Sequence, residues 1–396
     1  MNDVYILDGA RTPFGSFGKS LRSISAMEMG RLTAVEAMKR SNISPEAIDQ
    51  IVYGNVIQTS TNAAYLSRHI GLHAGVPQET PALIVNRLCG SGLQAVVSAA
   101  QGIRLGEGKT ALVGGTENMS MSPHADFTSR FAGKKLGNIK LEDMLLNTLT
   151  DQYCGCGMGI TAENLSNKYS ISREDQDEYA YESHQRAARA TESGRFKKEI
   201  IPVEIKTRKS VQVFDQDEHV KANTTEEKLA LLRPTFKDDG SVTPGNASGI
   251  NDGAASLVIA GEDYVKGERK KPLAKIVSWG IAGVDPTIMG IGPVPASKMA
   301  LERAGLDISD IDLVEINEAF AAQYLAVEKE LQLNREITNV NGGAIALGHP
   351  VGASGSRLLL TLAYELKERG LRYGLASLCI GGGQGISMLI ESQYKG

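Results

Sequence analysis

The second half of this 396-residue chain repeats the pattern of its first half. Residues 44–53 (SPEAIDQIVY) resemble residues 307–316 (DISDIDLVEI), and in both a polar helix-start signal leads through a short helix or turn to an apolar strand. A turn with a reactive side chain follows in each half. A period near half the chain length predicts two similar domains rather than a solenoid. Chance likeness between two α/β segments remains the alternative.

Strand-like and helix-like runs alternate along the whole chain. Residues 51–56 and 110–115 are mostly apolar and are candidate strands, whereas residues 93–104 are rich in Ala and Val and follow a helix pattern. This βαβ rhythm predicts an α/β fold. The stretch from about 120 to 246 is more polar, and we expect it to be an inserted, mainly helical domain.

Composition narrows the classes of function. The formal net charge is -4, so no overall basic field exists to attract nucleic acid. The sequence has no apolar run of about 18 residues, which predicts no membrane span, and its first residues lack the layout of a signal peptide. Four cysteines in a chain of this size do not form a disulfide framework, and this favours a reducing cytoplasm.

Cys89 lies in the turn 86–92 (NRLCGSG), between an apolar strand pattern and a helix pattern. A thiol at a helix N-terminus faces the positive end of the helix dipole, which favours the nucleophilic thiolate. The glycines on its C-terminal side leave space for an acyl group. The alternative is an inert buried cysteine.

His349 stands in a glycine-rich segment, 341–350 (NGGAIALGHP), just before another helix pattern. Closeness to a helix N-terminus disfavours imidazolium, so we expect a neutral ring that can accept a proton. A hydrogen-bonded structural histidine is the alternative.

Cys379 ends the apolar run 374–378 and precedes three glycines. Strand ends in α/β folds often carry functional sites, and a glycine-rich turn can present N–H groups to an oxyanion or to a phosphate.

Asn317 follows the strand pattern 313–316; it could donate a hydrogen bond or simply cap a helix. Cys154 and Cys156 suggest a metal or redox site, but metal sites usually need a second ligand pair, so we predict no metal.

These motifs in this order resemble the thiolases. They are Cys89 in its Cys-Gly-Ser-Gly turn, residues 317–320 (NEAF), residues 348–350 (GHP) and residues 379–383 (CIGGG). The likeness runs from residues 11–15 (RTPFG) to the last glycines, and within the family it is strongest to the acetyl-CoA acetyltransferases.

The resemblance implies a five-layered αβαβα fold. It implies an N-terminal domain from residues 1–119 and 247–269, an inserted loop domain of residues 120–246, and a C-terminal domain of residues 270–396. It also implies a homotetramer, a dimer of dimers, with part of the inserted domain serving as the tetramerisation loop.

The resemblance also implies roles for single residues. Cys89 takes the acyl group, His349 activates Cys89, and Cys379 acts as acid and base on the acetyl methyl carbon. Asn317, through a water, and His349 form one oxyanion hole, and the N–H groups of Cys89 and Gly381 form the other. Coenzyme A is then a substrate and product, with no permanently bound cofactor.

Nine positions match the family's contacts to coenzyme A against the loop domain: Leu149, Met158, Lys221, Phe236, Ser248, Gly249, Met289, Ala319 and Phe320. The sequence departs from the biosynthetic pattern at Gly157, where a histidine is typical, and at Lys221, where arginine is common. Lysine would hold a phosphate without a bidentate fork. Pro244 replaces a common alanine.

The implied activity is an acetyl-CoA C-acetyltransferase acting on acyl-CoA substrates. A broad-chain degradative 3-ketoacyl-CoA thiolase is the nearest alternative, since the missing histidine weakens the case for strict short-chain preference. A decarboxylating ketosynthase would typically pair its cysteine with two histidines, whereas here Cys379 occupies the third position. A non-catalytic acyl-CoA-binding scaffold of a β-oxidation complex would not need all three reactive groups.

Overall fold

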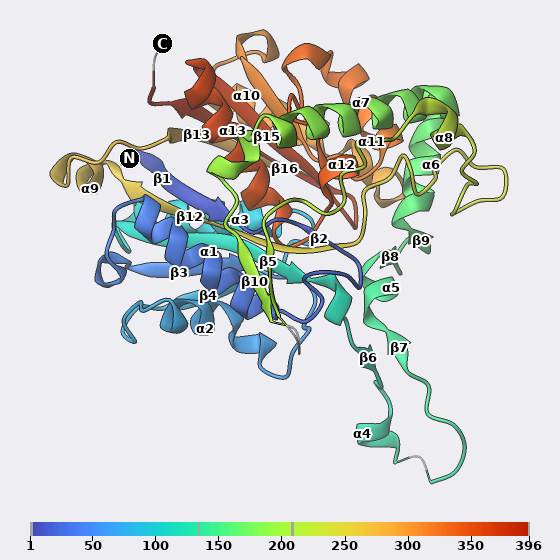
Figure 1. The fold of residues 1–396 in the computed structure, drawn as a ribbon, viewed down its shortest axis with the longest axis horizontal. Helices are drawn as coiled ribbons and strands as arrows, with labels where there is room; N and C mark the ends of the chain where they lie inside the picture. The colour runs from blue at the N-terminus through green and yellow to red at the C-terminus, as the bar shows by residue number, and fades with distance from the viewer. Residues whose placement is uncertain (1–2, 134, 207–209, 395–396) are drawn as a thin grey trace.

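The computed structural model describes residues 3–133, 135–206 and 210–394, and its main strands join into one sheet (Figure 1). The order across this sheet is β14-β15-β16-β13-β1-β12-β5-β3-β4, with the short β2 paired to β12. The bounds are β1 Val4–Arg11, β2 Gly15–Ser16, β3 Gln50–Gly54, β4 Ala82–Val85, β5 Thr110–Asn118, β12 Asn251–Gly261, β13 Ala274–Gly283, β14 Leu313–Ile316, β15 Tyr373–Ile380 and β16 Gln384–Ser392.

The two halves of the sheet repeat one topology. In β1-β12-β5-β3-β4 the first two pairings are antiparallel and the last two parallel. In β13-β16-β15-β14 the same order of antiparallel and parallel pairings recurs, and a parallel bridge from Val314 to Thr338 stands where β4 would be. The predicted duplication is therefore confirmed. A short antiparallel pairing of β1 with β13 joins the halves into one sheet, which the sequence did not predict.

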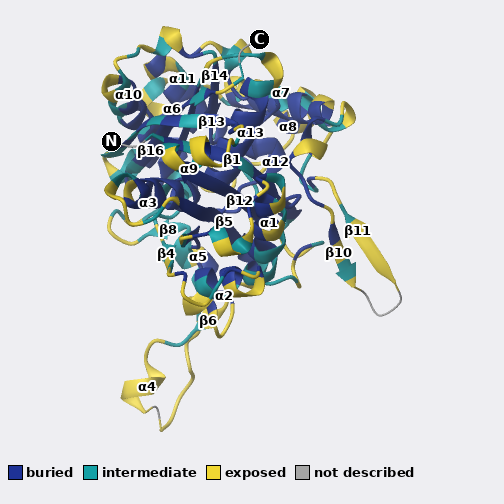
Figure 2. Ribbon diagram, turned by 90° about the vertical axis from the view of Figure 1, so that its left-hand side faces the viewer, coloured by how far each residue is buried: buried dark blue, intermediate teal, exposed yellow. Residues whose placement is uncertain are grey.

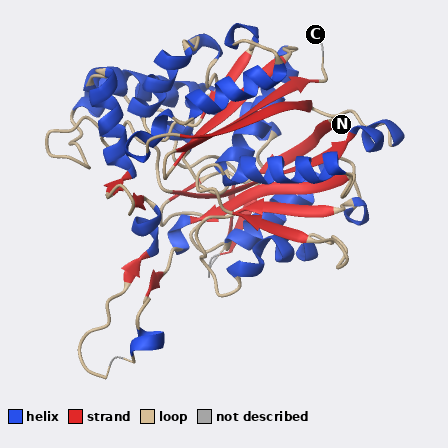
Figure 3. Cartoon of the chain, turned by 180° about the vertical axis from the view of Figure 1, so that it is seen from behind, coloured by secondary structure: helices blue, strands red, loops and turns tan. Residues whose placement is uncertain are grey.

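Helices complete five layers, as Figure 3 shows from behind. Helices α1 (Ala26–Arg40) and α2 (Leu66–His73) cover the outer face of the first half, and α10 (Pro293–Ala304) and α11 (Ala321–Leu331) that of the second. Helices α3 (Ser91–Leu105) and α13 (Ser354–Arg369) pack together between the halves. The predicted αβαβα architecture is confirmed.

Side chains that alternate along each strand pack into separate hydrophobic cores. On β5, Leu112 points into the outer core with α1 and α2, whereas Ala111 and Val113 point into the central core with α3 and α13. On β15, Leu375 faces α10 and α11, while Leu378 joins the central core. Successive side chains of a strand point to opposite faces, so strands covered on both faces are apolar throughout, as their continuous hydrophobic runs indicated.

The N-termini of α3 and α13 touch, and glycines permit it. A Cβ on Gly92 would lie 2.7 Å from the backbone N of Ser356, and a Cβ on Gly355 would lie 2.4 Å from the N of Leu93. A side chain at either place would separate the two helices. This contact brings the turns that carry Cys89 and His349 to the same place between the halves.

The segment from 120 to 246 forms two arms and a helical cap (Figures 1 and 2). Helices α6 (Met158–Tyr169), α7 (Arg173–Glu192) and α8 (Glu226–Ala230) lie against the second half. The first arm runs through β6 (His124–Ala125), α4 (Ser129–Ala132), β7 (Glu142–Asp143), α5 (Met144–Thr148), β8 (Thr150–Asp151) and β9 (Cys156–Gly157). The second arm is the hairpin of β10 (Val203–Lys206) and β11 (Val211–Phe214). Its strands make the segment less helical than expected, and the boundaries 120 and 246 stay a prediction.

A buried ion cluster ties this segment to the sheet. Arg11 on β1 donates to both carboxylate oxygens of Asp217, at 2.7 and 2.8 Å, and to Glu199 Oε1 at 2.9 Å. The Arg11 side chain is wholly buried, so both carboxylates are needed to satisfy its charge.

Two further short helices are α9 (Glu262–Gly267) and α12 (Ala344–Leu347). In the described ranges, no helix combines the length and apolarity that a membrane crossing requires.

Candidate active site

Cys89 lies in the tight turn between β4 and α3, where Leu88 adopts a left-handed conformation with φ of 46°. The backbone N–H groups of Gly381 and of Cys89 itself lie near enough to the half-buried thiol to favour its ionised form. Cys89 packs in an apolar cluster with Ile57, Leu149 and Val351. The turn after β15 in the second half therefore approaches the sulfur that the first half carries.

Burial raises the pKa of Cys89 to about 11. The two N–H groups act in the opposite direction, and the charge of Glu117 adds to the rise. The N–H groups favour the thiolate, as we expected of a helix N-terminus, but the loss of hydration on burial outweighs them. The resting group is a thiol, so it needs a base when it attacks.

His349 follows α12 and precedes α13, and it is buried. The Ser354 hydroxyl donates to the carbonyl of Pro350 at 2.9 Å and lies 2.5 Å from Nδ1 of His349. The hydroxyl has one hydrogen; with that hydrogen on Pro350 O, Ser354 Oγ accepts from Nδ1–H. We therefore assign the Nδ1–H tautomer, which leaves the lone pair on Nε2.

Burial lowers the pKa of His349 to about 3, and the positive charge of Arg357 lowers it further. The ring is neutral, as expected, but burial rather than the helix terminus is the main cause. The Nε2 atom lies 3.4 Å from Nδ2 of Asn317. Sequence reasoning missed Ser354; its signal was its place in the first turn of the helix after His349.

Asn317 carries an unsatisfied oxygen at this point. Its backbone N–H donates to Ser377 O at 2.9 Å, which fixes it beside β15. Its side chain is buried, and Oδ1 has no hydrogen-bond partner among the residues that the structure describes. A buried amide oxygen without a partner calls for a polar ligand or water. The side chain of Asn317 is therefore better suited to hold a water molecule than to cap a helix.

Cys379 lies near the end of β15 and is fully buried. Burial raises the pKa of its thiol well above the usual value, and the neighbouring Cys89 raises it further. The two sulfurs are thus close enough to influence each other's ionisation. The apolar residues packed around Cys379 include four of the positions matched to coenzyme A contacts: Met158, Met289, Ala319 and Phe320.

The remaining matched positions divide into two places. Leu149 packs in the apolar cluster of Cys89, Phe236 meets Phe320 edge to face at 6.2 Å, and the N–H of Ser248 donates to Ala319 O at 3.0 Å. A separate surface hollow of about 450 Å³ holds Lys221, and Gly249 borders it through His219. Its lining residues are Ser16, Phe17, Lys19, Glu218, His219, Lys221 and Ile250.

Ile250 connects the two places, because it lines the hollow and packs in the cluster that contains Cys89. The hollow with its lysines therefore adjoins the apolar cluster that contains Cys89. A cationic surface beside an apolar cluster with a reactive thiol suits a long ligand with an anionic end and a reactive end.

Glu117 is a second residue that the sequence did not indicate. Its carboxylate accepts from the N–H groups of Val56, Ile57 and Gly352 and from Asn55 Nδ2. Burial raises its pKa to about 8 in spite of these donors. It links the loop beside Cys89 to the loop after His349.

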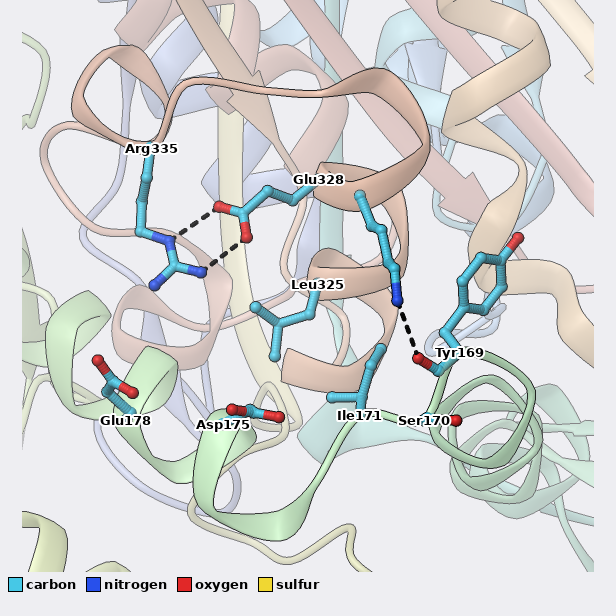
Figure 4. Close-up of a pocket in the computed structure, with 9 residues that line it drawn as sticks. Tyr169, Ser170, Ile171, Asp175, Glu178, Leu325, Glu328 and Arg335 are labelled. Carbon is cyan, nitrogen blue, oxygen red and sulfur yellow. Dashed lines mark hydrogen bonds and ion pairs between the residues drawn. The ribbon is translucent and has the colours of Figure 1, made fainter.

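Another hollow, of about 340 Å³, is a separate feature (Figure 4). It lies between the α6–α7 turn and α11, where Arg335 pairs with Glu328 at 2.7 Å. None of the residues discussed above lines it. Over the described parts of the chain, no group of three or more His, Cys, Asp or Glu side chains is arranged to hold a metal.

Comparison with protein families matches residues 4–263 to "Thiolase, N-terminal domain" and residues 270–392 to "Thiolase, C-terminal domain". Human "3-ketoacyl-CoA thiolase, mitochondrial" is 50% identical over 99% of each chain. "Acetyl-CoA acetyltransferase" from Syntrophomonas wolfei is 47% identical over 98% of this chain and 99% of its own. The human enzyme's crystal structure aligns with a TM-score of 0.96 over 99% of both chains.

A duplicated five-layered α/β fold, with a thiol and a neutral imidazole between its halves, defines a class of acyltransferases. The two family matches span most of the chain, so the protein belongs to the thiolase family.

Proposed function

We propose that this thiolase is an acetyl-CoA C-acetyltransferase, which joins two acetyl-CoA into acetoacetyl-CoA and CoA and also runs the reverse thiolysis. The observation that carries the proposal is the closeness of the Cys89 and Cys379 thiols, which come from opposite halves and influence each other's ionisation. A neutral His349 that can accept a proton belongs to the same site. A covalent intermediate divides one difficult step into two easier ones.

In thiolysis, Cys89 attacks the 3-keto carbon while His349 Nε2 takes the thiol proton. The C2–C3 bond breaks, and Cys379 protonates the carbanion to give acetyl-CoA. A CoA thiol then gives its proton to the Cys379 thiolate and attacks the acyl carbon of acyl-Cys89. The bond from that carbon to the Cys89 sulfur breaks, the shortened or acetyl product leaves as its CoA thioester, and His349 returns the proton to the Cys89 thiolate. Condensation is the reverse, in which Cys379 removes a proton from acetyl-CoA.

Negative charge develops on oxygen in each step. In this proposal the N–H groups of Gly381 and Cys89 donate to the oxygen of a thioester on the Cys89 sulfur; their stabilising effect on the Cys89 thiolate supports this assignment. His349 and Asn317, with a water, serve the enolate oxygen in this proposal. Loss of one oxyanion-hole donor costs about 3–4 kcal/mol in similar chemistry.

Coenzyme A enters as a substrate, with no cofactor permanently bound. Its acyl end lies among Met158, Met289 and Phe320, and its phosphates meet Lys221 in the surface hollow. A relative, the human mitochondrial enzyme, has been solved "in complex with CoA" and aligns with a TM-score of 0.96. That likeness supports coenzyme A as a ligand, and Lys221 is an exposed cation in the surface hollow that a phosphate could meet.

The second candidate is a broad-chain degradative 3-ketoacyl-CoA thiolase. Gly157 favours this candidate, because it has no side chain beside Met158, where a histidine is typical of the biosynthetic pattern. Relatives bearing that name are 50–52% identical to this chain. The ratio of kcat/KM for acetoacetyl-CoA to that for longer 3-ketoacyl-CoA separates the candidates, since a ratio near one rejects strict short-chain preference.

We also propose a homotetramer in the cytoplasm. Support for the tetramer comes from the first arm, whose large apolar side chains are solvent-exposed in the single chain: Phe127, Phe131, Leu136, Ile139 and Leu141. Light scattering after size exclusion tests the assembly. The four free cysteines suit a reducing compartment. Several relatives are named mitochondrial, so cell fractionation decides the location.

Turnover of acetoacetyl-CoA with CoA tests the activity itself. We expect thiolysis by the unmodified protein and its loss in Cys89→Ala. A scaffold would bind acyl-CoA without turnover, and a decarboxylating ketosynthase would release carbon dioxide from a malonyl thioester. Either of those outcomes rejects the proposal.

A further inference from the structure

Cys154 and Cys156 lie outside the catalytic arrangement and close to each other. They occupy the tip of the β8–β9 hairpin, in which Asp151 pairs with Cys156 and Thr150 with Gly157. Cys154 Sγ donates to Asp151 O at 3.8 Å, and Cys156 Sγ donates to Cys154 O at 3.5 Å. The side chain of Cys156 is near enough to raise the pKa of Cys154, and both residues are half-exposed.

The turn between the two cysteines favours closure to a disulfide. Fully extended, residues two apart have Cα atoms about 7 Å from each other, at the outer limit for a disulfide. The hairpin turn shortens this separation, and Gly155 with φ of 67° lets the chain reverse between the two cysteines. Two thiols offer only two ligands, and no third metal-binding side chain joins them among the described residues. Redox chemistry is therefore the better assignment than metal binding.

We propose that Cys154 and Cys156 form a thiol–disulfide exchange site that reacts with low-molecular-weight disulfides and closes to an intra-hairpin disulfide. The Cys154 thiolate attacks one sulfur of the disulfide, whose S–S bond breaks to release one thiolate. Cys156 then attacks the Cys154 sulfur and releases the second thiolate. The protein loses two electrons and two protons, and the small disulfide becomes two thiols.

The pair is dithiol at rest in a reducing compartment. Burial raises the pKa of Cys154, and the charges of Asp151 and of an ionised Cys156 raise it further. A raised pKa means fewer thiolates at neutral pH, so exchange accelerates as the pH rises. Excess reduced thiol reverses the closure.

The hairpin is attached to the acyl-binding wall. Met158 follows Cys156 by two residues, its N–H donates to Leu149 O at 2.9 Å, and its sulfur lies 3.3 Å from where a Cβ on Gly381 would be. Closing an eleven-atom ring at the tip restricts this segment. A small displacement of an active-site wall can cost up to about 100-fold in rate. We therefore expect oxidation to lower kcat/KM for thiolysis, a consequence that rests on the proposed function.

The first experiment needs no turnover. A C89S/C379S variant retains Cys154 and Cys156 as its only cysteines and is incubated with oxidised glutathione, then analysed by intact mass and peptide mapping. We expect a mass loss equal to two hydrogen atoms and a Cys154–Cys156 linkage, reversed by reduced glutathione. No reaction, or stable glutathione adducts on both residues, overturns the site. Should that variant not fold, mapping of the oxidised unmodified protein decides, and a Cys89–Cys379 linkage in place of Cys154–Cys156 overturns it.

The second experiment tests the effect on activity. Oxidised glutathione should lower kcat/KM by roughly tenfold in the unmodified protein and leave C154S/C156S unchanged. An equal fall in both proteins, or no fall once the disulfide has formed, overturns the link to the acyl-binding wall. Failure of all thiolysis before oxidation would instead reject the proposed function and leave the mass result standing.

Discussion

The resting protonation state of Cys89 gives a quantitative prediction. Burial raises the pKa of this thiol from an ordinary 9.0 to about 11, while burial lowers that of His349 to about 3. A proton shared between such groups stays on sulfur, so the free enzyme holds a neutral thiol and a neutral imidazole. Both shifts therefore favour the neutral pair over the thiolate–imidazolium pair that is common in cysteine enzymes.

This rise of about two units in the pKa of Cys89 makes its thiolate about 100-fold rarer at neutral pH than that of a thiol with an ordinary pKa. The higher nucleophilicity of a more basic thiolate recovers about tenfold of that loss. Alkylation of Cys89 should therefore be about tenfold slower than that of a free cysteine, and it should gain one decade per pH unit between about pH 6 and 9.

The assay is alkylation by iodoacetamide, followed by mass spectrometry. The C154S/C156S variant removes the two half-exposed thiols, and peptide mapping separates Cys89 from the fully buried Cys379. A plateau in the rate of Cys89 alkylation between pH 6 and 8 would reveal a preformed thiolate and refute the reasoning. A rate above that of free cysteine would do the same.

Three further predictions concern separate parts of the molecule. Cys379→Ala should keep acylation of Cys89 but lose deuterium exchange into the acetyl methyl group; unchanged exchange rejects the role of Cys379. Asp217→Asn should lower the free energy of unfolding by about 3 kcal/mol, because it leaves the buried Arg11 charge half-paired, whereas Glu262→Gln in an exposed ion pair should cost less than about 1 kcal/mol in the same denaturant titration. Lys221→Ala should raise KM for acetoacetyl-CoA by about fivefold, equal to about 1 kcal/mol, and leave KM for the pantetheine thioester unchanged. Equal changes for both substrates would place the phosphates elsewhere.

Local pattern predicted much of this fold. Strands with both faces covered are apolar throughout, and the two halves carry the same succession of such runs, so the duplication could be read at residues 44–53 and 307–316. The pairing of β1 with β13 could not, since it joins strands some 270 residues apart along the chain and depends on how the halves meet. The hairpins within 120–246 were missed because their strands are only two to four residues long.

The reactive side chains were identifiable, whereas their electrostatics were not. Cysteine and histidine beside glycine mark Cys89, His349 and Cys379 in the sequence. Burial is a property of the whole fold, and it reverses the expected direction of the pKa of Cys89. The Nδ1–H tautomer of His349 depends on a hydroxyl whose hydrogen is committed to Pro350, a geometric fact that no sequence pattern states.

Acyl transfer from acetyl-CoA to a single sulfur tests the central claim most directly. Brief incubation with acetyl-CoA, acid quenching and peptide mapping should place one acetyl group on Cys89, and none should appear in Cys89→Ala. An acetyl group on Cys379, or a labelled Cys89→Ala variant, would show that a different sulfur is the nucleophile and contradict the mechanism.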